Sequence, residues 1–300
     1  MGHDHDHASS NARRLVIAIS IVAVFLIVEI CGSLLAGSLA LIADAGHMFS
    51  DLLGLVVALV ALGIAARPAT DRQTFGYQRA EVLGALANGL ILSGVAIFVA
   101  VQGVTRLFEP SEVLGAPMLV VAGLGLLANV AVMLVLRGGS KDSIGMRGAY
   151  LEVLGDLFGS VAAIVAGVVI LLTGFVQADA IASLVIAALI VPRAFSLLRD
   201  VVHVLTESVP TNMSVVEIRQ HLLDAPGVVD VHDVHVWAIT SGAPVFSAHI
   251  VVEQAVFAEG RTGALLDELG SCMAGHFDVE HSTFQLEPEE HAAHEEQHHR

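Results

Sequence analysis

Charged side chains are scarce in this chain. Of its 300 residues, 15% are Asp, Glu, Lys or Arg, 55% are hydrophobic, and the mean hydropathy is +0.76. This composition excludes an ordinary soluble domain. Cysteine is scarce too, because Cys31 and Cys272 are too few and too far apart to form a disulfide framework or a cysteine-based metal site.

Several enzyme motifs are also missing. The sequence contains no His-Glu-x-x-His run, no Gly-x-Ser-x-Gly run and no glycine-rich phosphate-binding loop. A membrane protease is therefore disfavoured, and we expect no enzyme activity and no prosthetic group. The net charge of −16 argues against nucleic acid as a partner.

Long apolar runs dominate the first two thirds of the sequence. A bilayer span needs roughly 20 mostly apolar residues, and after residue 205 such runs stop. The pattern predicts an all-α six-helix transmembrane domain over residues 15–205 and a soluble α+β domain over 206–288, with polar tails at 1–14 and 289–300. The predicted spans are 15–36, 39–65, 82–104, 113–136, 149–173 and 178–198.

Basic residues flank these spans asymmetrically, and they gather on the side that holds both termini. By the positive-inside rule, both termini and the soluble domain are cytoplasmic. The first span is too long for a signal-peptide core and has five more spans behind it. Compact loops and the lack of an organelle-targeting sequence favour a bacterial inner membrane. The basic residues on the cytoplasmic side are Arg13, Arg14, Arg67, Arg72, Arg79, Arg137, Lys141 and Arg147.

Two pairs of ionisable residues lie inside predicted spans at i, i+4 spacing: His47 with Asp51, and Glu152 with Asp156. A charge near the bilayer centre costs at least ~2.5–3.5 kcal/mol, so each pair needs compensation. The spacing places each pair on one helical face. If the two faces meet, one imidazole and three carboxylates form a four-coordinate shell for a divalent cation. The alternative is polar pairing that holds the bundle together, which leaves excess negative charge unbalanced.

Four further polar residues in or near the spans have two open interpretations. They could line a water-filled path, or they could make helix-to-helix hydrogen bonds. They are Glu29, Asn88, Asn129 and Asp179.

The soluble domain shows mixed periodicity. Helices are predicted at 214–225 and 259–276, and strands at 228–239, 245–253 and 279–287, in the order αββαβ. His232 and His249 fall on what we expect to be central strands and His281 on the last, so three histidines could converge on a metal, or could simply lie at a surface or dimer interface. His235 points the other way if its strand is regular.

Both ends of the chain carry histidines among acidic residues. Such tracts bind divalent metals loosely, and the alternative is a solvated tail without a metal-gathering role. They are His3, His5 and His7 at the start, and His291, His294, His298 and His299 at the end.

Five segments resemble the cation diffusion facilitators, a family that exports divalent metals. They are residues 38–51, 74–85, 152–160, 232–237 and 284–287, so nearly the whole chain is covered. The resemblance implies a homodimer in the inner membrane, six helices per protomer and a ferredoxin-like cytoplasmic domain. It also implies a transport site made by His47, Asp51, Glu152 and Asp156, with metal leaving the cytoplasm in exchange for protons by alternating access.

Position 152 departs from the family pattern, since zinc exporters of the family usually have His where this chain has Glu152. A carboxylate makes the ligand set harder, which shifts preference toward Mn²⁺, Fe²⁺ or Co²⁺ without excluding Zn²⁺ or Cd²⁺. Zn²⁺ is the first choice because His47 remains. His47 and Glu152 are the expected proton carriers. A metal-gated channel and a metal sensor are the alternatives from other classes.

Overall fold

The computed structural model describes residues 3–65, 69–137, 144–240, 242–279 and 281–292. Within its helices the side chains of residues 3–16, 54, 55, 57–63 and 144–152, among others, lie outside the described part. The chain divides into two compact units, one comprising Met1–Val60 and Gly84–Leu198, the other Ala61–Leu83 and Arg199–Arg300.

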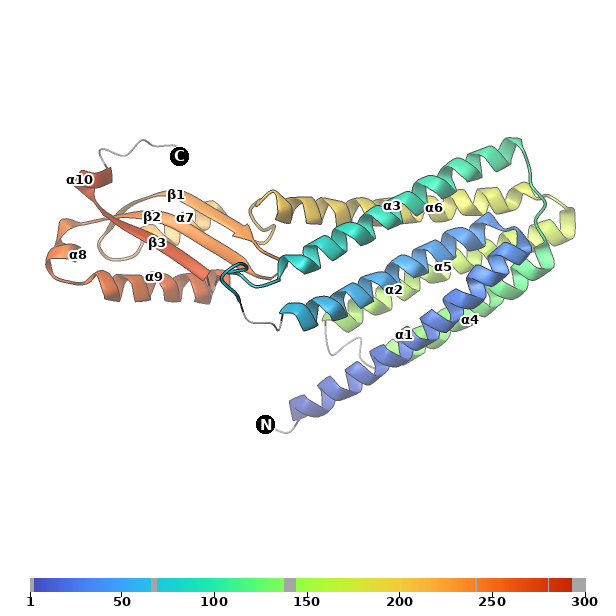
Figure 1. The fold of residues 1–300 in the computed structure, drawn as a ribbon, viewed down its shortest axis with the longest axis horizontal. Coiled ribbons are helices and arrows are strands. Elements are labelled where there is room, and N and C mark those ends of the chain that lie inside the picture. The colour runs from blue at the N-terminus through green and yellow to red at the C-terminus, as the bar shows by residue number, and fades with distance from the viewer. Residues whose placement is uncertain (1–2, 66–68, 138–143, 241, 280, 293–300) are drawn as a thin grey trace. The chain divides into compact units, whose positions relative to one another are not determined.

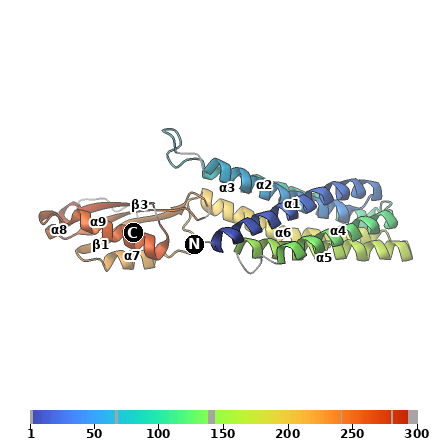
Figure 2. The same ribbon diagram turned by 90° about the horizontal axis from the view of Figure 1, so that it is seen from below.

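Six long helices make up the first two thirds of the described chain (Figures 1 and 2). Five of them are long and apolar enough to cross a membrane, and the remaining one, α2, has 27 residues, several of whose side chains lie outside the described part. The predicted transmembrane helical domain is therefore confirmed. The helices are α1 (His3–Ala36), α2 (Leu39–Ala65), α3 (Arg79–Phe108), α4 (Gly115–Arg137), α5 (Ile144–Thr173) and α6 (Gln177–Leu205).

Glycines allow these helices to approach closely. A Cβ atom added to Gly32 of α1 would overlap the side chain of Val121 on α4, and one added to Gly46 of α2 would lie 2.5 Å from Val95 Cγ1 on α3. Lipid is as apolar as the helix surfaces, so helix association in a membrane depends on such close contact rather than on a hydrophobic driving force. Gly159 of α5 likewise faces the carboxylate of Asp44 on α2.

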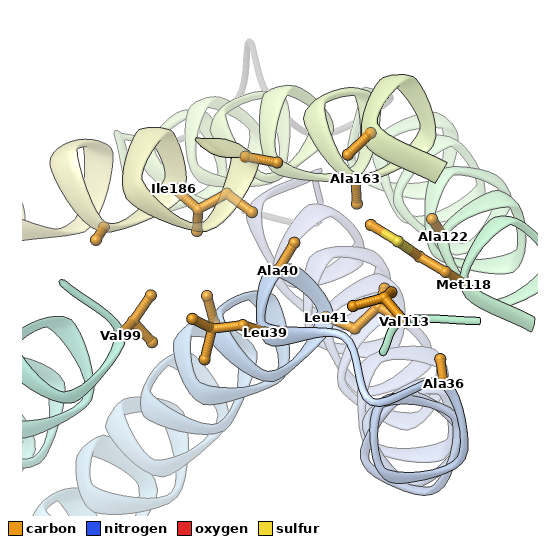
Figure 3. Close-up of a cluster of buried hydrophobic side chains, with 14 of the residues drawn as sticks. Ala36, Leu39, Ala40, Leu41, Val99, Val113, Met118, Ala122, Ala163 and Ile186 are labelled. Atoms are coloured by element: carbon orange, nitrogen blue, oxygen red, sulfur yellow. The ribbon is translucent and has the colours of Figure 1, made fainter. Parts of the chain in front are cut away.

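An apolar core is shared by residues of α2, α3, α4, α5 and α6 (Figure 3). Leu39 and Leu41 of α2 and Met118 of α4 are at most 1% exposed, and Ala163 of α5 is fully buried. Small side chains alternate with large ones here, which lets neighbouring helices interdigitate. This packing holds the N-terminal end of α2 against its neighbours.

Asp179 of α6 caps the first turn of α2. Its carboxylate accepts hydrogen bonds from Ser38 Oγ at 2.6 Å, from the backbone N–H of Leu39 at 2.8 Å and from that of Ala40 at 3.1 Å. A carboxylate at a helix N-terminus satisfies free N–H groups and complements the helix dipole. Arg106 Nη1 lies 3.6 Å from the same carboxylate. Asp179 thus belongs to the helix-to-helix hydrogen bonds and fixes where α2 begins.

Within the described residues, the C-terminal domain has three strands and its two longer helices in the predicted order, with two extra short helices, α8 and α10. Strand β2 pairs antiparallel with β1 and parallel with β3, so the sheet order is β1-β2-β3. The expectation that His232 lies on a central strand is wrong, because β1 is at the edge of the described sheet. The elements are α7 (Val215–Leu223), β1 (Val228–Ala238), β2 (Pro244–Val252), α8 (Gln254–Ala258), α9 (Thr262–Phe277), β3 (His281–Pro288) and α10 (Glu289–Ala292).

The two faces of this sheet differ. On β2, alternate residues Phe246, Ala248, Ile250 and Val252 are at most 2% exposed and pack with apolar residues of α7 and α9. The residues between them face the other way, and His249 is among these. One face therefore forms the core of the domain, and the other carries polar side chains.

A β-bulge in β1 changes which face His235 occupies. His232 pairs with His249, and His235 pairs with Ser247, so a step of three residues along β1 lies opposite a step of two residues along β2. The extra residue is accommodated at Asp233, whose φ is +45°. His235 consequently shares the face of His232, because the strand is not regular.

Candidate metal centres

Three predicted ligands converge between α2 and α5, and we call them the membrane cluster: His47, Asp51 and Asp156. His47 Nε2 lies 3.1 Å from Asp156 Oδ1 and 3.8 Å from Asp51 Oδ2. The three side chains are between 9% and 14% exposed, and one ligand atom from each lies within 4.8 Å of the others. The i, i+4 pair on α2 thus faces the acidic residue of α5, as the sequence predicts.

The nitrogen and oxygen atoms that meet in this cluster are suited to bind a cation. Arg193 Nη1 lies 3.2 Å from His47 Nε2, and because a guanidinium can only donate, Nε2 accepts in the tautomer of His47 that carries its proton on Nδ1. An acceptor nitrogen then faces two carboxylate oxygens at spacings close to the roughly 3.3 Å edge of a tetrahedral shell with 2.0–2.1 Å bonds. Asp156 Oδ1 is buried and makes no hydrogen bond within the described residues. Three acceptors around one point are a ligand set for a divalent metal.

Glu152, the fourth predicted ligand, lies on α5 one turn before Asp156. Its side chain is outside the described part of the structure. Its place in the ligand shell therefore stays a prediction.

Arg193 is a residue of this site that sequence reasoning missed. Its Nη2 lies 2.8 Å from Asp51 Oδ1, so α6 contributes a positive charge to the membrane cluster. The signal was present, since Arg193 is a charged residue inside a predicted apolar span and follows Pro192.

The remaining polar residues of the helices divide into two kinds. Asn88 Oδ1 accepts from Ser50 Oγ at 2.8 Å, and Asn129 Nδ2 donates to Ser160 Oγ at 3.2 Å, so both join neighbouring helices. Glu29 is fully buried, and neither of its carboxyl oxygens has a hydrogen-bond partner within the described residues. Hydrogen bonding between helices therefore does not explain the presence of Glu29.

A second group, the sheet cluster, lies on the polar face of the C-terminal sheet and comprises His232, His249 and Glu287. Glu287 Oε1 lies 2.8 Å from His249 Nδ1, and Oε2 lies 3.4 Å from His232 Nε2. The two imidazole centroids are 5.1 Å apart, and Glu287 is 1% exposed. Two imidazoles and a buried carboxylate are ligands that zinc and similar metals accept.

His281 does not join the sheet cluster, so the predicted convergence of three histidines is wrong in its third member. His281 pairs with Val245, whereas His249 pairs with Gln285. Four residues of strand separate these positions by roughly 13 Å. The ring of His281 instead lies 5.7 Å from that of Phe75. Parallel pairing of β3 with β2 brings Glu287 to the place expected for His281.

The histidine-rich tails lie largely outside the described residues. The side chains of residues 3–7 and all of residues 293–300 are not described, and His291 is exposed on α10. Metal binding by the tails stays a prediction.

Comparison with known proteins identifies the family. The cation efflux transmembrane domain matches residues 15–206, and the cytoplasmic domain of cation efflux proteins matches residues 210–289. The chain belongs to the cation efflux, or cation diffusion facilitator, family. This membership makes it a multi-pass membrane transporter of metal cations and not an enzyme.

Full-length relatives of this transporter are similar over nearly all of it. The metal cation efflux system protein CzcD of Cupriavidus metallidurans is 41% identical over 286 residues, which cover 95% of this chain and 90% of that protein. The zinc transporter ZitB of Pectobacterium atrosepticum is 39% identical, covering 100% and 94%. A cadmium, cobalt and zinc/H⁺-K⁺ antiporter of Bacillus velezensis is 37% identical, covering 97% and 93%.

Solved structures similar to part of the transporter include a cytoplasmic domain. It is the metal-bound C-terminal domain of the CzcD transporter from Cupriavidus metallidurans, with 37% identity and a TM-score of 0.23. The match covers 25% of this chain and 99% of that structure.

Proposed function

We propose that this transporter exports Zn²⁺, and with it Cd²⁺ or Co²⁺, from the cytoplasm in exchange for protons. The observation that carries the proposal is the convergence of His47, Asp51 and Asp156 within 4.8 Å between two membrane helices. The names of the relatives CzcD, ZitB and the cadmium, cobalt and zinc antiporter agree with this range of metals.

The transported ion binds where the three acceptors meet. His47 Nε2 and one oxygen each of Asp51 and Asp156 replace water around it, and Glu152 completes the shell from α5. Metal ligands must be deprotonated, so protons arriving from outside compete with the metal and release it. Histidine is the side chain whose unperturbed pKa lies closest to neutral pH, so His47, together with Glu152, carries those protons.

Arg193 supplies a competing charge. Its guanidinium contacts both Asp51 and His47 at 3.2 Å or less, so it occupies part of the space beside the donor atoms. Its side chain is 39% exposed and can move aside. We infer that metal entry displaces Arg193 from Asp51 and that its return assists metal release.

The arrangement of the whole protein follows the family. The transporter is a homodimer in the inner membrane, with both termini and the C-terminal domain in the cytoplasm. The family match to the cytoplasmic domain and the distribution of basic residues support this arrangement.

The sheet cluster has a separate role. His232, His249 and Glu287 bind a regulatory divalent metal in the cytoplasm. This proposal replaces His281 of the predicted set by Glu287.

Transport by purified protein in proteoliposomes tests the export function. Asp51→Asn and Asp156→Asn each remove one ligand charge at almost constant volume, so Zn²⁺ flux and the accompanying proton flux should fall to background while the proteins still insert and fold. Asp71→Asn, in an exposed loop, is the matched control and should keep full flux. Full flux in both site variants would refute the ligand set, and metal flux insensitive to the proton gradient would favour a channel.

The same assay distinguishes between two candidate sets of transported metals. Because Glu152 replaces the usual His, the second candidate function is export of Mn²⁺ or Fe²⁺. Flux measured across Zn²⁺, Cd²⁺, Co²⁺, Fe²⁺ and Mn²⁺ ranks them directly, and the proposal expects Zn²⁺ first.

A further inference from the structure

A third group of ligand side chains lies on the helices of the C-terminal domain, and we call it the helix cluster: His221, Cys272 and His276. Cys272 Sγ lies 3.9 Å from His221 Nδ1, and the rings of His221 and His276 have centroids 5.0 Å apart. One ligand atom from each residue lies within 4.8 Å of the others. Local spacing along the sequence does not predict this cluster, because 51 positions separate His221 from Cys272.

The packing of the two helices creates this juxtaposition. The side chains of Leu222 on α7 and of Leu269 and Met273 on α9 pack into the core of the domain, and each of them is at most 1% exposed. Each ligand comes from the outward side of a helix whose inner side is held in place. Cys272 and His276 are one turn apart on α9, so they share a face.

The ring of His221 is further held by an aromatic neighbour. Phe277 meets it edge-on, with centroids 5.1 Å apart. His221 and His276 are exposed, and Cys272 is partly exposed. A metal ion can therefore reach the cluster without unfolding of the domain.

The ligand chemistry limits the metal. A thiolate with two imidazoles selects Zn²⁺, Cd²⁺ or Co²⁺ over Mg²⁺ and Ca²⁺, which prefer oxygen. Partial burial, and then the charge of Glu268, raise the pKa of the Cys272 thiol. Any metal bound here must displace that proton, which again disfavours cations with weak affinity for sulfur.

We propose that His221, Cys272 and His276 form a metal site of their own for Zn²⁺ or Cd²⁺, on the opposite side of the domain from the sheet cluster. Three protein ligands leave a fourth position for water or another group. A bound ion joins α7 to α9 and so stabilises the cytoplasmic domain when cytoplasmic metal rises. The site does not depend on the transport mechanism, because none of its residues belongs to the membrane cluster.

Cobalt absorption of the purified full-length protein tests the site. The chain has two cysteines, so Cys31→Ser leaves Cys272 as the only thiol. Addition of Co²⁺ to this variant should produce the near-ultraviolet charge-transfer band of a cobalt–thiolate bond. Further replacement by Cys272→Ser should abolish the band, and Zn²⁺ should displace the cobalt and protect Cys272 from alkylation.

Histidine variants show whether the thiol acts alone. In the Cys31→Ser background, His221→Ala or His276→Ala should each weaken Co²⁺ binding more than about tenfold, since loss of even an outer-shell partner typically costs 10–100-fold. His281→Ala, a histidine near Phe75, is the control and should leave the band unchanged.

Absence of the band at excess Co²⁺, or a band that both histidine variants leave unchanged, would overturn the proposal. Neither result bears on export, since flux that requires Asp51 is measured separately.

Discussion

In the proposed transport site, the three residues of the membrane cluster act as ligands and Arg193 acts as their competitor. His47, Asp51 and Asp156 present acceptor atoms to one point, whereas Arg193 places a positive charge against two of them. At an effective dielectric constant of 20, two like charges 4 Å apart repel by about 4 kcal/mol. Metal and guanidinium therefore compete for the same carboxylate.

Replacing Arg193 should strengthen metal binding. Arg193→Gln removes the competing charge. The guanidinium of Arg193 is partly exposed and escapes most of the repulsion by moving aside when the metal enters. We therefore expect Zn²⁺ to bind the variant roughly tenfold more tightly, which is a gain of about 1.4 kcal/mol in binding free energy. Zinc release should slow, so kcat for transport falls as KM falls. Equilibrium binding and proteoliposome flux measure the two effects. Arg199→Gln, which removes an exposed arginine paired with Asp200 on the same helix, should change neither, and equal or weaker zinc binding by Arg193→Gln would contradict the competitor role.

Glu152 should set the choice of metal. Glu152→His replaces a hard carboxylate by an imidazole and is expected to raise the ratio of Zn²⁺ to Mn²⁺ flux. Competition assays in proteoliposomes provide the ratio. An unchanged metal ranking would remove Glu152 from the ligand shell.

At the scale of helices, glycine and one buried carboxylate determine how the bundle assembles. Gly32 lets α1 touch α4, and Asp179 of α6 caps α2 at Leu39 and Ala40. Both features act between helices distant in sequence. They position the N-terminal half of α2, and His47 lies two turns beyond the cap.

The contact at Gly32 provides a stability test. In Gly32→Ala the new methyl group overlaps Val121, a short and stiff side chain, so we expect a loss of about 1–3 kcal/mol. Thermal unfolding in detergent should show the loss, and Val121→Ala in the same protein should restore part of it. Gly94→Ala meets no atom within 4 Å and should keep or slightly raise the melting temperature, because alanine favours a helix over glycine. Equal melting temperatures for Gly32→Ala and Gly94→Ala would disprove the close contact.

For the whole molecule, the candidate metal sites lie in two separate units. The membrane cluster belongs to the unit that contains α2 and α5, and the sheet cluster belongs to the unit that contains the C-terminal domain. No ligand is shared between the two clusters. Loss of one cluster should therefore leave the ligand set of the other intact.

Glu287 provides the test of this independence. Glu287→Gln keeps the shape of a buried side chain but removes the charge between His232 and His249, so each protomer should lose one equivalent of tightly bound Zn²⁺. Metal analysis after dialysis measures this, and Zn²⁺ transport should continue. Glu289→Gln, in exposed α10, should retain the metal. Full zinc content in Glu287→Gln would show that the sheet cluster is not a metal site.

The sequence by itself determined what local chemistry can determine. Apolar runs, turn residues and strand periodicity predicted the helices and the αββαβ order, and i, i+4 spacing predicted that His47 and Asp51 share a face. Each of these depends on neighbours within a few residues, where helix and strand geometry are known in advance.

Tertiary structure decided every relation between distant segments. The parallel register of β3 chose Glu287 over His281, and the bulge at Asp233 turned His235 to the face of His232. Packing of α7 on α9 brought Cys272 to His221, a pairing that cysteine count and spacing argued against. Register, bulges and helix packing depend on contacts across the fold, so the local spacing of residues along the chain does not show which side chains those contacts bring together.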